Sequence, residues 1–95
     1  MIGEAEFEWD EAKSRSNFRE RGFDFEFATR IFDGHCIEED DSRKDYGERR
    51  IAATGKIEDG VFVVVYTWRS GRRRIISARL AKRKERDEYR KAYPD

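Results

Sequence analysis

Hydrophobic residues are most concentrated in residues 61–69, where β-branched and aromatic side chains follow one another almost without a break. Such a run predicts a central strand that is covered on both faces. An arginine-rich second strand is predicted over residues 72–79, and the dipeptide Ser70-Gly71 between the two is typical of a tight turn. The pattern therefore predicts an antiparallel hairpin at the centre of the fold.

The turn also predicts the register of this hairpin. With Ser70-Gly71 as the two turn residues, Tyr66 lies opposite Ile75 and Phe62 lies opposite Arg79. Side chains alternate between the two faces of a sheet, so Arg79 is expected on the same face as Phe62. This is the bulkier face, which suits helix packing.

The N-terminal part predicts a short edge strand and then a helix. Residues 6–9 alternate between polar and apolar side chains, as an edge strand does. Asp10 is a suitable N-cap for a helix that runs to about Arg21 and ends at Gly22. The expected buried side of this helix is thin and consists of Ala12, Ser16 and Phe18.

The remaining elements follow from similar signals. Asp24 is a second N-cap, for an apolar helix that ends at Asp33-Gly34, and residues 35–38 are expected to form a short strand. Residues 39–47 predict a solvated polar loop that lacks the ligand spacing of a calcium-binding loop. A further strand over 48–58 turns at Asp59-Gly60, and a basic terminal helix over 81–93 ends at Pro94.

This order of elements predicts a single α+β domain over residues 1–95. It has two N-terminal helices, a central antiparallel sheet of about four strands and a C-terminal helix. One cysteine, no apolar run of 18 residues and no signal-peptide pattern lead us to expect a soluble cytoplasmic protein without a membrane segment.

Charge is distributed unevenly along the chain, although the net charge is zero. Residues 1–48 contain 7 Lys/Arg and 15 Asp/Glu, for a net −8, and residues 49–95 contain 14 and 6, for a net +8. The segregation indicates a basic surface for a polyanion. The alternative is that the two signs mix in the folded protein.

Known catalytic motifs are missing from the sequence. There is no zinc-type Cys/His cluster, P-loop, nucleophile elbow or dinucleotide glycine pattern, and no metal or cofactor is predicted. His35 is the single histidine, which excludes acid–base chemistry by two histidines. A lone histidine at the start of a strand is usually a partly buried structural residue.

Arginines on adjacent strands are the remaining candidates for a functional site. One guanidinium group can donate to two phosphate oxygens at once, and it stabilises the extra negative charge of a phosphoryl transition state. Arg79 follows apolar residues within its strand and is expected to be partly buried with Glu85 as its neighbour. The alternative for the arginines near the turn is pairing with carboxylates on a solvated surface. Three aromatic residues suit stacking on unpaired bases: Tyr66, Trp68 and Tyr89.

Several segments resemble the BrnT family, the toxins of BrnT–BrnA type II toxin–antitoxin modules. The resemblance covers nearly the whole chain and rests on Phe7-Glu8-Trp9-Asp10-Glu11-Ala12-Lys13, Asn17, Gly22, Phe25, Glu48-Arg49, Gly55, Val63-Val64-Val65-Tyr66-Thr67, Arg69, Arg74-Ile75-Ile76-Ser77-Ala78-Arg79-Leu80-Ala81, Glu85 and Tyr89. It implies a RelE-like fold, ribonuclease activity that arrests translation, and a BrnA antitoxin that covers the toxin. It also implies that operator DNA is bound only through the antitoxin. The family commonly has Lys-His-Gly where this chain has Glu20-Arg21-Gly22.

The first hypothesis is therefore a metal-independent endoribonuclease toxin. Arg79 and Arg69, with Arg49, would hold the scissile phosphate, and Glu85 or Tyr89 would transfer a proton. The expected RNA-binding residues are Arg50, Arg72, Arg74, Lys13 and Arg21. The second hypothesis is a binding module for RNA or antitoxin without catalysis. Direct sequence-specific DNA binding is the weakest reading, and dimerisation within a complex stays open.

Overall fold

A computed structural model describes residues 6–41 and 47–94 of the chain. It contains one five-stranded mixed sheet in the order β1-β5-β4-β3-β2. The strands are β1 (Phe7–Trp9), β2 (Cys36–Asp40), β3 (Ile51–Ile57), β4 (Gly60–Arg69) and β5 (Arg72–Leu80). The helices are α2 (Glu11–Arg21), α3 (Phe25–Ala28) with its 3-10 continuation η1 (Thr29–Asp33), and α4 (Arg83–Ala92).

The α+β class is confirmed, but a purely antiparallel sheet of about four strands is wrong. β1 joins the edge of the sheet parallel to β5, with Phe7 opposite Arg73 and Trp9 opposite Ile75. Alternating polarity predicts that a segment is a strand, but it carries no information about the direction of its neighbour. Two helices in the N-terminal part and one at the C-terminal end are present as expected, but their placement differs: the second is α-helical only over Phe25–Ala28 before it continues as η1, and the last begins at Arg83 and not at residue 81.

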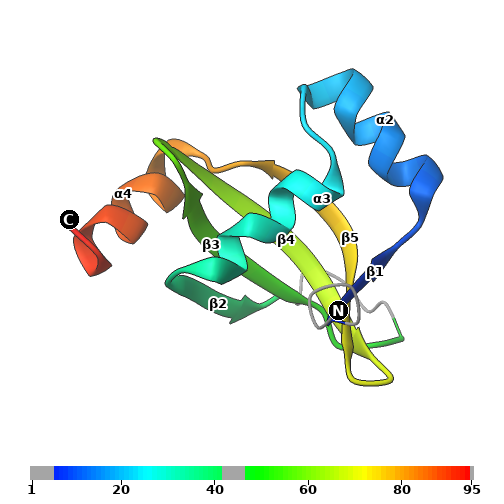
Figure 1. Ribbon diagram of the computed structural model, residues 1–95. Helices are drawn as coiled ribbons and strands as arrows, with labels where there is room; N and C mark the ends of the chain where they lie inside the picture. Colours follow the sequence, from blue (N-terminus) through cyan, green and yellow to red (C-terminus); the bar gives the residue numbers. More distant parts are fainter. Residues whose placement is uncertain (1–5, 42–46, 95) are drawn as a thin grey trace.

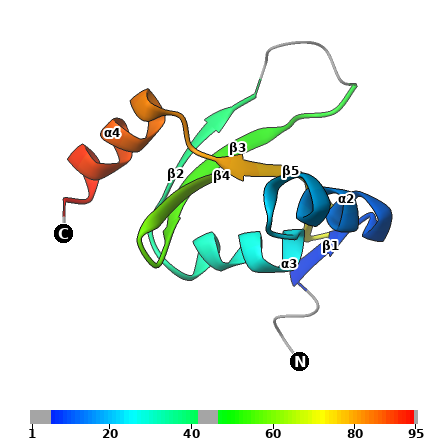
Figure 2. The same cartoon turned by 90° about the horizontal axis from the view of Figure 1, so that it is seen from above.

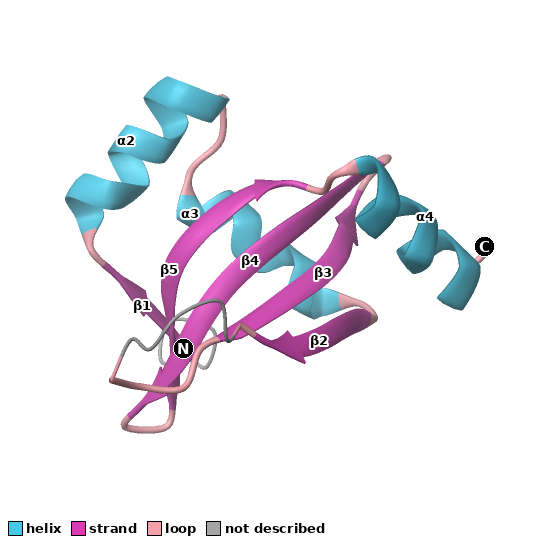
Figure 3. Cartoon of the chain, turned by 180° about the vertical axis from the view of Figure 1, so that it is seen from behind, coloured by secondary structure: helices cyan, strands magenta, loops and turns pink. Residues whose placement is uncertain are grey.

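The helices leave most of one sheet face uncovered. α2, α3 and η1 lie on the same side of the sheet, and α3 crosses in front of the strands in Figure 1. The view from above in Figure 2 shows α2 and α3 together below the sheet and α4 beyond one end of it. Seen from behind in Figure 3, the middle of β3, β4 and β5 has no helix over it. A functional surface can therefore lie on this open face.

The predicted caps set the limits of the first two helices. The Asp10 carboxylate accepts hydrogen bonds from the backbone N–H groups of Ala12 and Lys13. Gly22 ends α2 in the left-handed conformation at φ 90°, which glycine adopts without strain. Asp24 caps α3 by accepting from the backbone N–H of Phe27 at 2.9 Å. All three boundaries are as predicted.

The expected apolar side of α2 is wrong, because polar side chains attach this helix to the fold. Ser14 and Asn17 are the buried residues of α2, whereas Phe18 is 58 % exposed. The Ser14 hydroxyl accepts from the backbone N–H of Phe25 at 2.9 Å, and the Asn17 amide donates to the Phe23 carbonyl at 2.9 Å. Hydrogen bonds to the following helix thus replace an apolar stripe.

The main core lies between the sheet and the N-terminal helices. Its buried members are Phe25, Ala28, Ile31, Ile51, Ala53, Ile57, Phe62, Val64, Tyr66, Ile75 and Ala78. Gly55 allows η1 to approach the sheet, since a Cβ at this position would lie 2.7 Å from the Ile31 Cβ. A second cluster under α4 consists of Val61, Val63, Ala81 and Tyr89.

The central hairpin has an irregularity that the turn did not predict. From the turn to the Tyr66–Ile75 pair the register is the predicted one. The next pair is Val65 with Ser77, so Ile76 is an extra residue on β5. Such a β-bulge places two residues of one strand opposite one residue of its partner.

The bulge reverses the predicted faces at the end of β5. Arg79 pairs with Val63, not with Phe62, and Ala78 takes the place in the core that regular pairing gives to Ser77. The predicted placement of Arg79 on the helix-covered face is therefore wrong. A bulge leaves little trace in the alternation of a strand that is apolar or basic throughout.

Smaller differences occur at the other boundaries. The β3–β4 turn consists of Glu58 and Asp59, one residue before the predicted pair, and Glu58 has φ 55°. The end of β2 includes Glu39 and Asp40, which belonged to the predicted loop, while residues 42–46 of that loop lie outside the described residues. Within residues 6–41 and 47–94, no helix is long and apolar enough to cross a membrane.

Candidate active site

A pocket of about 550 Å³ lies on the open face of the sheet. Its lining residues come from α2, from strands β2 to β5 and from the start of α4: Arg21, Glu39, Asp40, Asp41, Ala52, Val65, Ser77, Arg79, Lys82 and Glu85. The floor is one row of paired residues across four strands, in the order Glu39, Ala52, Val65 and Ser77. Small side chains in the middle of this row leave the space open.

Arg79 and Glu85 form the most specific contact in the pocket. Arg79 Nη1 and Nη2 donate to the two oxygens of the Glu85 carboxylate at 2.8 and 2.9 Å. Arg79 Nη1 also donates to the Leu80 carbonyl at 3.2 Å. The two side chains are each about one-third exposed, at 33 % and 31 %. The prediction that Arg79 and Glu85 are neighbours is confirmed. The bidentate contact fixes the plane of the Arg79 guanidinium.

The same contact determines the charge of Glu85. Its hydrogen bonds with Arg79 lower the pKa of Glu85 from 4.5 to about 2, and the backbone N–H of Lys82 contributes to the shift. That N–H donates to Glu85 Oε1 at 2.7 Å, so the Glu85 carboxylate caps the start of α4. Glu85 is therefore ionised at neutral pH and is a weak proton acceptor there.

Arg21 reaches the pocket from the end of α2. Its Nη1 donates to the Ala78 carbonyl at 2.8 Å and to Asn17 Oδ1 at 3.3 Å, which ties α2 to β5. The sequence placed Arg21 among residues for RNA binding, and the structure brings it into the same pocket as Arg79. Lys82 is a further cation of the pocket that sequence reasoning missed, although it lies only three positions after Arg79.

The wall towards β2 is acidic. Asp40 Oδ1 accepts from Arg49 Nε at 2.7 Å, and this hydrogen bond raises the pKa of the Arg49 guanidinium above its usual value. The Arg49 side chain is 75 % exposed, and Arg49 is not a lining residue of the pocket. Arg49 thus lies outside the pocket that contains Arg79 and contacts it through Asp40.

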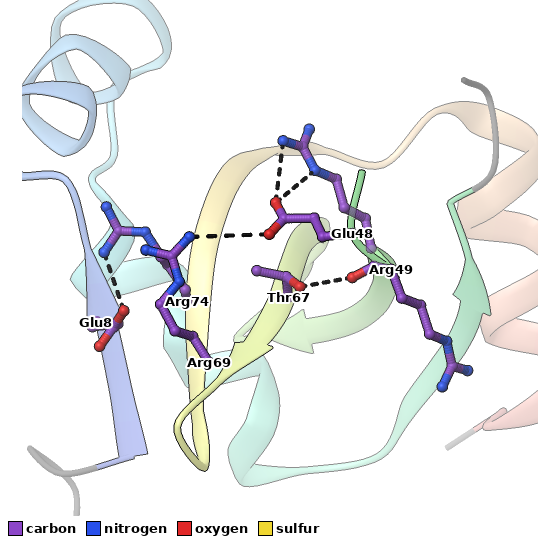
Figure 4. A network of polar contacts seen from close by, with 7 residues as sticks. Glu8, Glu48, Arg49, Thr67, Arg69 and Arg74 are labelled. Carbon is purple, nitrogen blue, oxygen red and sulfur yellow. Dashed lines mark hydrogen bonds and ion pairs between the residues drawn. The ribbon is translucent and has the colours of Figure 1, made fainter. Parts of the chain in front are cut away.

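Most other predicted arginines lie at the turn end of the sheet and pair with carboxylates (Figure 4). Glu48 is the shared partner of Arg50, at 3.5 Å, and of Arg69, at 4.0 Å. Glu8 on β1 lies 3.7 Å from Arg72 and 3.2 Å from Arg74. None of these four arginines lines the pocket.

These contacts also decide between the two interpretations of the uneven charge. Glu8, Asp40 and Glu48 belong to the acidic first half, and the arginines they contact belong to the basic second half. The two signs therefore mix at the turn end of the sheet. They also mix at the pocket, where the cations Arg21, Arg79 and Lys82 lie beside the carboxylates of Glu39, Asp40, Asp41 and Glu85.

The aromatic candidates fall into different environments. Tyr66 is 1 % exposed and donates its hydroxyl hydrogen to Glu38 at 2.7 Å. Burial, with this hydrogen bond, raises the pKa of Tyr66. Tyr89 is 5 % exposed and donates to the His35 carbonyl at 2.8 Å, outside the pocket. Of the three aromatic residues proposed for base stacking, Trp68 alone is exposed, at 52 %.

Lys13 and His35 also lie away from the pocket. Lys13 is an exposed residue of α2 that does not line it. The His35 ring stacks on Tyr93 with centroids 4.5 Å apart, next to α4. In the described part of the chain, no three His, Cys, Asp or Glu residues are grouped closely enough to hold a metal ion.

The fold and the pocket define a class of protein: a small single-sheet α+β domain with a polar pocket on its open face, lined by three cations and four carboxylates. Comparison with protein families then makes the assignment specific. The family described as ribonuclease toxin, BrnT, of type II toxin-antitoxin system matches residues 9–85, and the chain belongs to this family. Membership implies an antitoxin as partner. No curated protein matches the chain significantly.

Proposed function

We propose that this chain is a metal-independent endoribonuclease that cleaves cellular RNA, inhibits translation and is neutralised by a BrnA-like antitoxin. The observation that carries the proposal is the convergence of Arg79, Arg21 and Lys82 on one pocket, with Arg79 held by a bidentate contact to Glu85. Family membership supports the toxin and ribonuclease class.

The proposed reaction needs no group beyond the RNA itself as nucleophile. The 2′-hydroxyl oxygen attacks the adjacent phosphorus, and the bond from phosphorus to the 5′-oxygen breaks. The products are a 2′,3′-cyclic phosphate and a 5′-hydroxyl, with the 2′-hydroxyl proton passing to water and a proton from water reaching the leaving oxygen. Arg79, Arg21 and Lys82 stabilise the negative charge that develops on the phosphate oxygens. We expect a slow enzyme, since electrostatic stabilisation supplies most of the rate.

The surrounding residues have supporting roles in this proposal. Glu85, with its pKa of about 2, orients Arg79 and does not transfer the proton. Tyr89 holds α4 through its contact with His35. The arginines outside the pocket guide the RNA by long-range attraction: Arg49, Arg50, Arg69, Arg72 and Arg74. Lys13 contributes to the same field from α2.

Induced expression with wild type beside Arg79→Ala tests the proposal. We expect wild type to arrest growth and degrade RNA, and we expect the variant to lose both effects while staying folded and antitoxin-bound. Arg30→Ala is the matched control, since Arg30 pairs with Glu58 at 3.5 Å and does not line the pocket. Cleavage by purified protein should persist in a metal chelator. Intact RNA and normal growth with folded wild-type protein would refute the ribonuclease proposal.

The acidic wall favours one second candidate, a binding module without catalysis. Glu39, Asp40, Asp41 and Glu85 line the same pocket as the three cations and repel a polyanion. Glu20 in place of the family's lysine adds negative charge to the end of α2. If folded wild-type protein binds RNA or antitoxin with nanomolar to micromolar affinity and cleaves no RNA, this second function replaces the first.

A further inference from the structure

The acidic residues of the pocket differ in how they are engaged. Asp40 is held by Arg49 at 2.7 Å, and Glu85 is held by Arg79 at 2.8 Å. Asp41 takes part in contacts of its own. Glu39 is exposed, lines the pocket, and has no ion pair or side-chain hydrogen bond within residues 6–41 and 47–94. The Glu39 carboxylate is therefore available to accept hydrogen bonds from a ligand in the pocket.

Glu39 occupies one end of the pocket floor, and the cations occupy the other. Its partner across the sheet is Ala52, followed by Val65 and Ser77 on successive strands. Three interstrand spacings separate Glu39 from Ser77, a span of roughly 14 Å between backbones. Arg79 and Glu39 both line the pocket over this floor, and its volume of about 550 Å³ is within the range of cavities that hold a small ligand such as one nucleotide.

The floor between these ends fits a base. Ala52 and Val65 provide a short apolar surface without a bulky side chain. Glu39 also lines an adjoining hollow of about 50 Å³ together with Ala52 and two carboxylates of α4, Glu85 and Glu88. A nucleotide with its phosphate at Arg79 would thus lay its base over Ala52 and direct the base edge towards Glu39.

We propose that Glu39 selects guanine in the nucleotide whose phosphate is held by Arg79. An ionised carboxylate has two acceptor oxygens and no donor. Guanine presents two adjacent donors, N1–H and N2–H, which match both oxygens in a charge-assisted pair. Adenine and cytosine each place an acceptor beside their donor, and uracil flanks its single donor with two acceptors. The three other bases therefore set an acceptor against the carboxylate.

This inference rests on the proposed function and has a separate test. Binding of 3′-GMP, 3′-AMP, 3′-CMP and 3′-UMP is measured by calorimetry for wild type, Glu39→Gln and the control Glu26→Gln, with Glu26 exposed on α3. We expect wild type and the control to bind 3′-GMP at least about fivefold more tightly than the other three nucleotides. Glutamine presents one acceptor and one donor, so Glu39→Gln should lose this preference and favour 3′-AMP or 3′-CMP. Circular dichroism checks that the variants are folded.

The outcomes separate the inference from the proposed function. RNA cleavage without enrichment of guanine at the cut sites, or a guanine preference that survives in Glu39→Gln, overturns the inference and leaves the ribonuclease standing. Absence of nucleotide binding also overturns it. Unchanged nucleotide binding with a weakened antitoxin complex in Glu39→Gln assigns Glu39 to the protein partner instead. Selective 3′-GMP binding that depends on Glu39, without RNA cleavage, supports the inference and contradicts the ribonuclease.

Discussion

The two ends of β5 carry arginines in contrasting surroundings. At the turn end, Arg72 and Arg74 share the Glu8 carboxylate at 3.7 and 3.2 Å. At the other end, Arg79 makes two contacts of 2.8 and 2.9 Å with Glu85. Exposure does not separate the two ends, because the side chains of Arg74 and Arg79 are 29 % and 33 % exposed. What differs is the geometry of the partner and the presence of a pocket.

This difference shows how one residue type serves two purposes on one strand. A carboxylate shared by two arginines at longer distances holds neither guanidinium in a fixed plane, so such pairs contribute little and respond to salt. A bidentate partner fixes the plane, and Arg21 and Lys82 add converging charge beside it. We therefore expect the Arg79 end to carry the chemistry and the turn end to carry long-range attraction.

The largest difference is expected between lysine substitutions at the two ends of β5. Arg79→Lys keeps the charge but loses the bidentate contact, so we expect RNA cleavage to slow by about 100-fold. Arg74→Lys keeps the charge that attracts RNA and should slow cleavage by less than about threefold. Initial rates on one defined RNA substrate measure both. Equal losses in the two variants would mean that the ends of β5 are not functionally distinct.

A smaller loss is expected at the second arginine of the pocket. Arg21→Gln removes one cation and the contact with the Ala78 carbonyl, while Arg79 stays in place. We expect cleavage to slow by about tenfold, since one of several converging charges is lost. Arg15→Gln, an exposed position of α2 outside the pocket, controls for charge removal. A rate for Arg21→Gln equal to that of this control would remove Arg21 from the proposed site.

Features that depend on residues close together in the sequence were predicted correctly. Asp10, Gly22 and Asp24 fixed helix limits through caps, and a short turn fixed the first half of the β4–β5 register. The contact of Arg79 with Glu85 was also predictable, because β5 and α4 follow each other closely along the chain.

What the sequence failed to predict depends on contacts between distant segments. The bulge at Ile76 has no local signal, yet it turns Ser77 and Arg79 onto the open face. The acidic wall of β2 faces these residues only after the sheet assembles across four strands. Arg21 reaches β5 because Ser14 and Asn17 attach α2 by hydrogen bonds, a contact that the hydrophobic pattern does not contain.

The smallest expected effect concerns stability in acid at the Arg79 end. The folded pKa of Glu85 is lowered to about 2 from 4.5, so its stabilising contribution is present above pH 4.5 and is lost as pH falls towards 2. Because the pair is one-third exposed, solvent screening limits this contribution to about 1 kcal/mol. Urea unfolding at pH 7 and pH 3 should show that Glu85→Gln is less stable than wild type at pH 7 and that the gap narrows at pH 3. Arg79 and Lys82 are the partners that lower the pKa of Glu85, so the narrowing follows from protonation of this carboxylate. A gap that is constant with pH would show that Glu85 stabilises the fold by packing and not as the ionised partner of Arg79.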